Sequence, residues 1–591
     1  MAQRVYFNGE ILTIPSAYST TDVSGMTTKS DGENAKVIAL IGECAGGEPS
    51  TVQFFTEPTS ARKVLKSGDL LKACEKAWNP VSKTKDGVKL GGANTIACIR
   101  TNQATKSTYE IKKEDNVQVK LQSKDWGENV NYQIKISDGT LNNTKRVTIY
   151  DNVNKVYENF DNLGNLFTIK YIGEAPYAVL SVYKDAKGDM YLKTMIGEAE
   201  ESATEDIKIK LDRDVLKTIR ALAVELQAYE NYAIVTEDFF NNKLAVTDLD
   251  FVDKQNIKGN KETFGDAYRL TATYADLKST LETSSNLVEV AEFDKSKGAI
   301  DNFDYVTMTG GTAGTSPSSW VEFFDAISNF DITYIVPLTA DVAIHAELLA
   351  HINALSGNLG RERRGIVGGN LGENVQQVVR RALNLASDRM QVVYGGFYDY
   401  NSNNELELYP PYILGAQHAG RVAFLEDGES ATHDVYRMNS PEYKLERGEI
   451  TQLLQAGVLA FEFVLGKNGS SQSYVRLVQD LTTDVTSTDT VHTERATGAL
   501  ADSLNKEIRE ALDSLLTGKR TGVGDLTSAK NKVLSILDAR KRKGHLVDYK
   551  DVYVTKSGTV TEVDYSVAPA EPNNFTLITA HYYSQELSAE D

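Results

Sequence analysis

The chain has 591 residues and a formal net charge of −19 at pH 7, with 41% hydrophobic and 25% charged residues. This length predicts three or four domains, and the acidity argues against direct binding of nucleic acid, which selects basic surfaces. No stretch is apolar enough to predict a signal peptide or a membrane span, so we expect synthesis in the cytoplasm and no membrane insertion.

The N-terminal segment, residues 1–22, is predicted to form an arm. In "RVYFNGEILTI" the pair Asn8-Gly9 lies between β-prone residues, which is a strong signal for a hairpin. A polar stretch rich in Ser and Thr follows and is typical of a linker. A terminus without regular structure is the alternative that these residues leave open.

Residues 23–102 are predicted to form the first part of an α/β core. "KVIALIGECAGG" and "NTIACIRT" indicate buried strands. Between them, "PTSARKVLKSGDLLKACEKAWNP" predicts helix with Thr59 or Ser60 as its cap, an interruption at Gly68 and a stop at Pro80. The chain has three cysteines, Cys44, Cys74 and Cys98. Because they are odd in number and lie in apolar stretches, we expect them to be buried, reduced thiols.

Residues 103–302 differ in composition and are predicted to form a β-rich insertion. Alternating segments such as "VQVKLQ", "NYQIKIS" and "KRVTIY" indicate half-exposed strands, with Asn, Asp and Gly turns between them. Acidic helical segments such as "VLKTIRALAVELQAYE" are mixed in later. The insertion holds few residues that suggest catalysis.

The α/β pattern returns over residues 303–490, where "ITYIVPLT" and "MQVVYGGF" indicate buried strands and "DVAIHAELLAHINAL" and "NVQQVVRRALNLA" indicate helices. "AGVLAFEFVLG" and "SYVRLVQDLTT" indicate further strands. In the C-terminal region, residues 491–591, a long helix over 491–518 is predicted from the apolar stripe Leu500, Leu504, Ile508, Leu512 and Leu515. After this helix we expect a second helix ending in "ARKRKG", a hairpin in "DVYVTKSGTVTEVDYSV" and a terminal strand in "NNFTLITAHYYSQ".

The segment "TMTGGTAGTSPSSW", residues 307–320, has the glycines and hydroxyls of a phosphate-binding loop. However, Gly310, Gly311 and Gly314 do not fit G-x-G-x-x-G, and no lysine follows Gly314. Ser316 could instead cap a helix with Pro317 in its first turn. We interpret the segment as a structural turn into a helix, with phosphate binding as the alternative.

Histidines and nucleophiles form no catalytic or metal-binding pattern. His345 and His351 in "HAELLAH" are six residues apart and fall on different faces of a helix, whereas metal-binding helices place histidines at i and i+4. No G-x-S-x-G motif occurs, and no cysteine has a histidine beside it. We therefore expect no enzyme, no metal and no cofactor. The other histidines are isolated: His418, His433, His492, His545 and His581.

The strongest features are a basic segment, Arg540-Lys541-Arg542-Lys543, and β-prone arms at both ends. The basic segment either complements a helix C-terminus or docks on an acidic partner surface, and both interpretations stay open. The arms could add strands to the sheet edge of another subunit, which favours an assembly-forming protein. An enzyme whose residues meet only in three dimensions is the alternative.

Several segments resemble the contractile tail sheath proteins of large tailed bacteriophages. Residues 308–314, "MTGGTAG", are similar to the family's glycine loop, with Met308 for a leucine and Ala313 where aspartate is usual. "YIVPLTADVAIHAELLAHI" and "VRLVQDLTT" are similar to segments that follow that loop. "LIGECAGGEPSTV", "SGDLLKACEKAWNP" and "NLGNLFTIKYIGE" resemble sheath proteins of phages with Gram-positive hosts.

The resemblance implies a multidomain α/β (α+β) fold: a discontinuous sheath core, an insertion that projects outward, and extended β arms. It implies a virion protein whose copies stack as six-membered rings around the tail tube protein. The two ends of the stack are expected to contact baseplate and tail terminator proteins. Contraction would be irreversible and independent of ATP, and would drive the tube through the host envelope for genome delivery.

The resemblance also implies site residues. Strands exchanged between subunits are expected at Val5, Phe7, Ile11 and Ile14, and at Phe575, Leu577, Ile578 and Tyr582. Inner or tube-facing contacts are expected at Lys519, Arg520, Arg540, Lys541, Arg542 and Lys543. Two alternatives remain: the sheath of a phage-derived contractile injection system, and a soluble cell-wall-active enzyme of the virion. The enzyme should show clustered aromatics, whereas the three tryptophans are dispersed: Trp78, Trp126 and Trp320.

Overall fold

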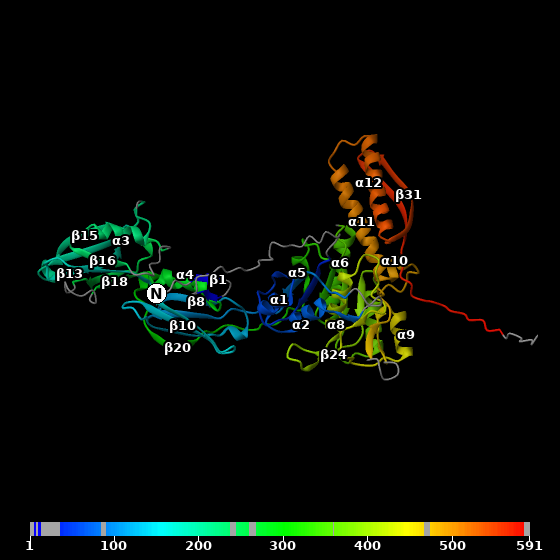
Figure 1. Cartoon of the computed structure of the whole chain (residues 1–591), viewed down its shortest axis with the longest axis horizontal. Coiled ribbons are helices and arrows are strands. Elements are labelled where there is room, and N and C mark those ends of the chain that lie inside the picture. The colour runs from blue at the N-terminus through cyan, green and yellow to red at the C-terminus, as the bar shows by residue number, and fades with distance from the viewer. Residues whose placement is uncertain are drawn as a thin grey trace, which may run out of the picture. The chain divides into compact units, whose positions relative to one another are not determined.

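The computed structural model describes residues 5–7, 10–12, 36–83, 90–214, 216–236, 244–258, 267–358, 360–465 and 473–583. These residues fall into two compact units (Figure 1). Unit 1 holds the described residues of 1–27 and 104–314, and unit 2 holds those of 28–103 and 315–591. The predicted α/β fold interrupted by a β-rich insertion is confirmed.

Unit 2 is built on a seven-stranded sheet with the order β28-β23-β22-β21-β3-β6-β4. Neighbouring strands are parallel except for β4, which runs antiparallel to β6. The strands are β3 (Ile38–Gly42), β4 (Val52–Phe55), β6 (Ile96–Arg100), β21 (Tyr334–Pro337), β22 (Arg364–Gly368), β23 (Met390–Val393) and β28 (Val458–Leu459).

Both faces of this sheet are covered by helices. On β3, Ile38 and Leu40 enter one hydrophobic core and Ala39 and Ile41 enter the other, because successive side chains of a strand point to opposite faces. Burial on both faces explains why these strands are continuous apolar runs in the sequence. The first core is closed by α1 (Pro58–Leu65), α2 (Asp69–Trp78) and α8 (Pro411–Phe424). The second is closed by α5 (Val321–Ala326), α6 (Val342–Asn353), α7 (Val375–Leu385) and α9 (Arg447–Gln455).

Smaller elements surround the main sheet of unit 2. A four-stranded sheet has the order β29-β30-β26-β5, and a three-stranded sheet has the order β25-β24-β27. Their strands are β5 (Val81–Lys83), β24 (Phe397–Tyr400), β25 (Leu406–Tyr409), β26 (Val435–Tyr436), β27 (Ser440–Pro441), β29 (Phe461–Val464) and β30 (Tyr474–Leu477). A π-helical turn, Ala354–Asn358, follows α6.

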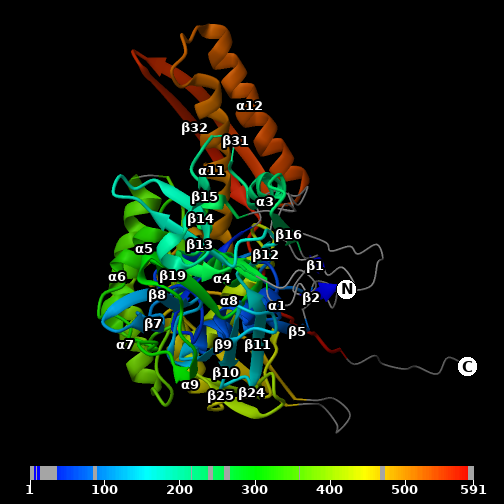
Figure 2. The same ribbon diagram turned by 90° about the vertical axis from the view of Figure 1, so that its left-hand side faces the viewer.

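The C-terminal region of unit 2 contains two long helices and a hairpin, which stand out from the α/β part (Figures 1 and 2). Its elements are α10 (Thr490–Thr493), α11 (Arg495–Leu516), α12 (Val523–Arg542), β31 (Leu546–Ser557) and β32 (Val560–Pro569). The predicted stripe is buried at Leu500, Leu504 and Ile508, which pack against Val533 and Leu537 of α12. The predicted hairpin is confirmed as the pair β31–β32.

Unit 1 contains two hydrophobic cores, one under each pair of antiparallel sheets. The sheets β11-β10-β9-β20 and β19-β8-β7 enclose the first core with α4 (Thr273–Ser284). The sheets β15-β14-β13-β17 and β16-β12-β18 enclose the second with α3 (Ile219–Gln227). Residues 303–314 belong to this unit because β20 (Phe303–Thr307) pairs with β9, so the chain returns to unit 2 at 315 rather than at the expected 303.

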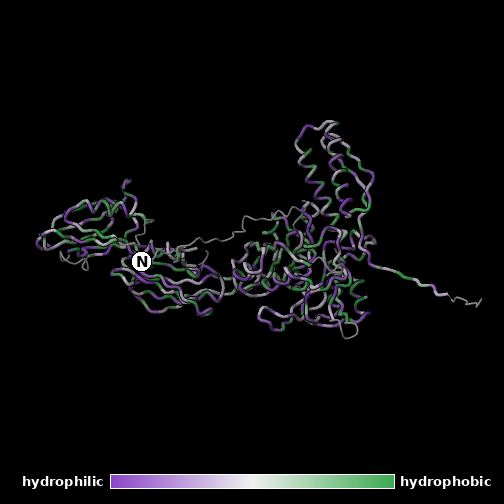
Figure 3. Tube along the Cα trace, in the orientation of Figure 1, coloured by the Kyte–Doolittle hydropathy of each residue, from purple (hydrophilic) through white to green (hydrophobic). Residues whose placement is uncertain are grey.

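The strands of the first core are β7 (Thr108–Lys113), β8 (Asn116–Ser123), β9 (Gln133–Asp138), β10 (Lys145–Asp151), β11 (Val156–Leu163), β19 (Val288–Phe293) and β20. Those of the second are β12 (Asn165–Tyr171), β13 (Tyr177–Lys184), β14 (Met190–Gly197), β15 (Thr204–Lys210), β16 (Tyr232–Thr236), β17 (Val252–Asn256) and β18 (Tyr268–Thr271). Hydrophobic residues alternate with polar ones along many of these strands (Figure 3), which accounts for the alternating sequence.

Two sequence predictions about local structure are wrong. The first helix begins at Pro58, since proline suits the first helical position, and Glu57 occupies the N-cap position without a side-chain hydrogen bond, so neither Thr59 nor Ser60 is the cap. Helix α5 begins only at Val321. Ser316 does not cap it: its hydroxyl contacts Thr101 Oγ1 (2.7 Å) and donates to Glu43 Oε1 (2.6 Å).

The terminal strand predicted in "NNFTLITAHYYSQ" is not formed within a single copy of the chain, where residues 570–583 form no strand. A β-strand requires a partner strand to accept and donate its backbone hydrogen bonds. The described residues of the chain offer this segment no such partner.

The packing of α6 gives a first prediction. Leu348 is fully buried in the second core, whereas Leu383 on α7 is 49% exposed. We expect Leu348→Ala to lower the free energy of unfolding by about 2–5 kcal/mol, because it leaves a cavity. Leu383→Ala should stay within about 0.5 kcal/mol of the unaltered protein. Urea unfolding followed by tryptophan fluorescence measures both, and equal losses would contradict this description of the core.

Candidate functional site

The glycine loop lies in unit 1, where it turns the chain alongside residues 105–108. Gly310 and Gly314 have φ angles of 93° and 67°, a region that favours glycine. A Cβ on Gly311 would lie 2.6 Å from the carbonyl oxygen of Gly127. The Gly311 amide donates to Asn131 Oδ1 (3.1 Å), and Thr105 N donates to the carbonyl of Thr312 (3.1 Å). The loop uses its glycines for close backbone packing within the protein.

The histidines at 345 and 418 are buried inside unit 2. His345 is 1% exposed, and Nε2 lies 2.9 Å from the Thr339 carbonyl, so it is a core residue. Burial first, and then the Arg381 guanidinium, lowers the pKa of His345 to about 4 despite the opposing hydrogen bond to Thr339. His418, which has no residue at ligand-like spacing in the sequence, is fully buried between Tyr436 and Asp480.

The cysteines, possible metal ligands and helix hydrophobicity each bear on a sequence prediction. Cys44, Cys74 and Cys98 are buried free thiols, as predicted. Across the part of the chain that the structure describes, no three His, Cys, Asp or Glu side chains are grouped to hold a metal ion. Within the same residues, no helix combines the length and hydrophobicity needed to cross a membrane.

The central feature of unit 2 is a buried ion pair between Asp480, just after β30, and Arg495, the first residue of α11. The Arg495 Nε and Nη2 atoms donate to Asp480 Oδ2 at 3.0 and 2.6 Å. Gln391 Nε2 donates to Asp480 Oδ1 at 2.9 Å, and Arg495 Nη2 also donates to the Glu429 carbonyl at 2.7 Å. Both charged side chains are essentially inaccessible to solvent. Burial alone would raise the pKa of Asp480, but Arg495 and His418 hold it well below its usual range.

Sequence reasoning missed this pair, although one signal was present. Arg495 is a cation at the N-terminal end of a helix, where the helix dipole disfavours positive charge. A nearby anion offsets this unfavourable interaction. Asp480 lies in the segment "VRLVQDLTT". That segment drew attention only because it is similar to a segment of tail sheath proteins.

A second buried cluster fixes α12 to the α/β part. Arg540 Nη1 donates to Asp427 Oδ2 (2.8 Å), and Arg540 Nε donates to Glu507 Oε2 (2.9 Å). Lys36 Nζ lies 3.0 Å from Asp427 Oδ1. Arg540 is 3% exposed, so its predicted role as a surface contact is wrong: its charge is used inside the protein. Burial opposes ionisation of Asp427, but Lys36, Ser503 and Arg540 lower its pKa to about 2.

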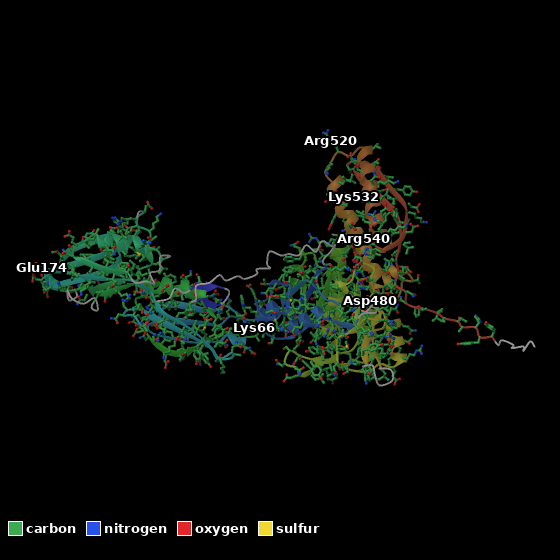
Figure 4. All side chains as sticks on the ribbon, viewed as in Figure 1. Lys66, Glu174, Asp480, Arg520, Lys532 and Arg540 are labelled. Atoms are coloured by element: carbon green, nitrogen blue, oxygen red, sulfur yellow. The ribbon has the colours of Figure 1, made fainter. Side chains whose placement is uncertain are left out.

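A third cluster holds α11 along its length. Arg364 Nη2 and Arg389 Nη2 lie 2.8 and 2.9 Å from the two carboxylate oxygens of Asp502. Farther along α11, Lys506 pairs with Asp331 and Arg509 pairs with Glu362. Figure 4 shows Asp480 and Arg540 within the body of unit 2, and Arg520 at the far end of the helices. The C-terminal region is therefore attached to the sheet largely through charged contacts.

The other predicted basic contacts lie on the surface. Lys519, Arg520, Lys541, Arg542 and Lys543 are exposed. Lys519 Nζ donates to the Ser514 carbonyl (2.8 Å), and Lys541 Nζ donates to Asp548 Oδ1 (2.7 Å). These side chains remain candidates for contacts with another molecule, in contrast to the buried Arg540.

The two arms differ in structure. At the N-terminus, β1 (Val5–Phe7) pairs with β2 (Glu10–Leu12) in one hairpin, with Val5 opposite Leu12. Val5, Phe7 and Ile11 lie on this hairpin, while Ile14 falls outside the described residues.

The C-terminal extension, residues 570–583, is anchored only at its start. The Ala570 amide donates to the His545 carbonyl (3.0 Å), and Asn574 Nδ2 donates to Glu494 Oε1 (2.8 Å). Beyond Asn574 the apolar side chains face solvent, with exposed fractions of 80% to 95% for Phe575, Leu577, Ile578, Tyr582 and Tyr583. Figure 3 shows these hydrophobic residues on a segment that leaves the body of unit 2.

No family model matches the sequence. The chain is 31% identical to the tail sheath protein of Bacillus phage SP01 over 584 residues, which cover 98% of this chain and 97% of that protein. The chain belongs to the tail sheath protein family. It is also 27% identical to the tail sheath protein of Staphylococcus phage Twort, over 97% of this chain and 98% of that protein. The sequence resemblance to sheath proteins of phages with Gram-positive hosts is confirmed.

Solved structures show the same fold for sheath proteins. The sheath tail protein of Listeria innocua matches with a TM-score of 0.54 at 15% identity, over 92% of this chain and 93% of that one. The sheath tail protein of Desulfitobacterium hafniense matches with a TM-score of 0.53 at 12% identity, over 94% and 96%. The chain is thus a structural protein of a phage's contractile tail sheath, and tail sheath proteins are components of the virion.

The buried pair gives a second prediction. We expect Asp480→Asn to lower the free energy of unfolding of the sheath protein by about 3–5 kcal/mol, because it leaves the Arg495 charge buried without its anion. The matched control is Asp331→Asn, which removes an ion pair with Lys506 at a carboxylate that is 81% exposed, and should cost about 0–1 kcal/mol. Chemical denaturation measures both, and a loss below about 1 kcal/mol for Asp480→Asn would contradict the role of the pair.

A third prediction concerns pH. The pKa of Asp427 is lowered on folding to about 2, so its stabilising effect is present above its unfolded value of about 3.9 and is lost as pH falls toward 2. The sheath protein should therefore have a higher melting temperature than its Asp427→Asn variant near pH 6, and the difference should shrink between about pH 4 and pH 2. Thermal unfolding across this range measures it, and a constant difference would contradict the assignment.

Proposed function

We propose that this sheath protein polymerises by strand exchange between copies and forms stacked six-membered rings around a tail tube. The observation that supports this most directly is the C-terminal extension, whose apolar side chains are exposed although they lie on a segment with β propensity. Such a segment gains backbone hydrogen bonds and apolar contacts by joining the edge of a sheet in another molecule.

The hairpin β31–β32 is the best candidate to receive this strand. It forms a sheet of two strands, and the described residues add no third strand at either edge. A two-stranded sheet gains stability from added strands, and its open edges present unpaired backbone donors and acceptors. Among the described residues, the N-terminal hairpin β1–β2 is likewise a sheet of only two strands. We propose that both arms link neighbouring copies in this way.

Contraction follows from such links without an enzymatic step or a cofactor. A strand from one copy in the sheet of the next is a head-to-tail contact that does not close, so the polymer can grow to any length. Flexible arms would keep copies connected while the globular parts move between two packings. The extended packing would be kinetically trapped, and its release would be one-way and would drive the tube through the envelope.

We propose that the tail tube contacts the exposed basic side chains at the C-terminal end of α12: Lys541, Arg542 and Lys543. Solvent-exposed ion pairs contribute about 0–1 kcal/mol each, which suits a contact that must release during contraction. Baseplate and tail terminator proteins would cover the two ends of the polymer. Assembly would take place in the host cytoplasm. The end-to-end similarity to phage proteins favours a phage tail over an injection system or a cell-wall enzyme.

The experiment compares two truncations of the purified protein. Removing residues 575–591 deletes the exposed apolar segment, while removing residues 584–591 keeps it and serves as the control. We expect the full chain and the shorter truncation to form long tubes in electron micrographs and to sediment rapidly. The longer truncation should remain monomeric with an unchanged circular dichroism spectrum. Tubes formed equally well by both truncations would contradict strand exchange through this segment.

A further inference from the structure

Unit 2 contains an open cleft of about 630 Å³ that the strand-exchange contacts do not use. It lies beyond the carboxyl ends of β22 and β23, between the N-terminal end of α7 and helix α9. Gly372 and Gly395, with φ angles of 74° and 77°, line the cleft and leave it open, because no side chain projects from them. Its volume lies in the range that accommodates small molecules or long side chains.

The polar wall of the cleft is negatively charged. Glu442 is held by two backbone amides, Gly372 N to Oε1 at 2.8 Å and Gly396 N to Oε2 at 2.9 Å. Glu449 accepts from the Glu446 amide at 2.9 Å in the first turn of α9. These amide donors hold both carboxylates in place, and among the described residues neither carboxylate forms an ion pair with a cation.

The third carboxylate of the cleft, Glu373, is neutralised by an ion pair: its Oε1 lies 2.6 Å from Arg381 Nη2. The negative charge of the cleft therefore comes from Glu442 and Glu449.

Two tyrosines complete the lining. Tyr394 is 7% exposed, and its pKa is raised to about 12 by burial first and then by the nearby Glu449, Tyr443 and Glu442. Tyr443 is 52% exposed at the rim. Aromatic ring faces attract cations, and Lys or Arg side chains gain from such contacts. Carboxylates beside aromatic rings match the chemistry of an ammonium or guanidinium group at the end of an aliphatic chain.

The chain itself presents such groups on the turn between α11 and α12. Lys519 and Arg520 are exposed there, and Figures 2 and 4 place this turn at the opposite end of unit 2 from α7 and α9. The turn of one copy cannot reach its own cleft, so only another copy can supply it. A contact between these two different surfaces is head-to-tail and leaves one free surface at each end.

We propose that the acidic cleft formed by Glu442, Glu449, Tyr394 and Tyr443 binds the basic turn, Lys519 and Arg520, of a second copy of this chain. The inference rests on the proposed polymerisation and adds a contact to it that involves no exchanged strand. It assigns Lys519 and Arg520 to contacts between copies rather than to the tube.

The test uses conservative variants of full-length protein. Glu442→Gln together with Glu449→Gln removes both charges; glutamine keeps an acceptor for the backbone amides and suits the helix position of Glu449. The control, Glu322→Gln, removes one negative charge from an exposed residue of α5 outside the cleft. We expect the double variant to need about a tenfold higher protein concentration to form tubes, and the control to be unchanged.

Charge reversal identifies the occupant. Glu442→Lys with Glu449→Lys should not form tubes alone, and neither should Lys519→Glu with Arg520→Glu. Mixtures of the two should form tubes, because each supplies the surface that its partner needs. A carbodiimide should also link Glu442 or Glu449 to Lys519 between isotopically distinct copies in assembled tubes.

Two results would overturn the inference. One is tube formation by the Glu442→Gln, Glu449→Gln protein at the wild-type concentration. The other is a Lys519→Glu, Arg520→Glu protein that polymerises normally and fails only to bind the tail tube. In both cases the truncation lacking residues 575–591 would still fail to polymerise if strand exchange is correct, so the two proposals fail separately.

Discussion

The ion pair between Asp480 and Arg495 is the interaction on which the rest of unit 2 depends. Asp480 follows a strand packed on the α/β part, and Arg495 begins the helix that leads into the C-terminal region. Both charges are removed from water, so the pair contributes less net stability than its short distances suggest, but breaking it leaves a charge buried alone. Each surface that the proposed assembly uses in this region, namely the hairpin, the extension and the basic turn, follows Arg495 in the chain.

Charge also organises the attachment of the two long helices. Asp427 and Asp502 accept arginines from opposite sides of the contact: Asp427 binds Arg540 of α12, and Asp502 of α11 binds Arg364 and Arg389. Charge-assisted hydrogen bonds between arginine and carboxylate groups require a defined geometry. A sheath subunit that must move relative to its neighbours while keeping its own shape benefits from fixed internal geometry.

Unit 1 is organised in a different way. Its two cores are enclosed by antiparallel sheets, and the chain enters it after Gln103 and returns to the sheath core at Thr315. The glycine loop lies just before the return, and its close contact with Gly127 explains the glycine at 311. The glycine loop therefore has a packing role in this chain, and the residues that polymerise the sheath are proposed to lie elsewhere.

The sequence by itself determined the fold class, the β-rich insertion, the apolar stripe of α11 and the family, because periodicity and motif order depend on neighbours along the chain. Only the tertiary structure decided that Arg540 is buried, that His418 contacts Asp480, and that glutamates from distant segments, Glu373 and Glu442, line one cleft. Partners of a charged side chain can lie more than a hundred residues away, as Asp427 does from Arg540, and no local pattern encodes that distance. The terminal segment shows the same limit: its residues favour a strand, but a strand forms only where another supplies the hydrogen bonds.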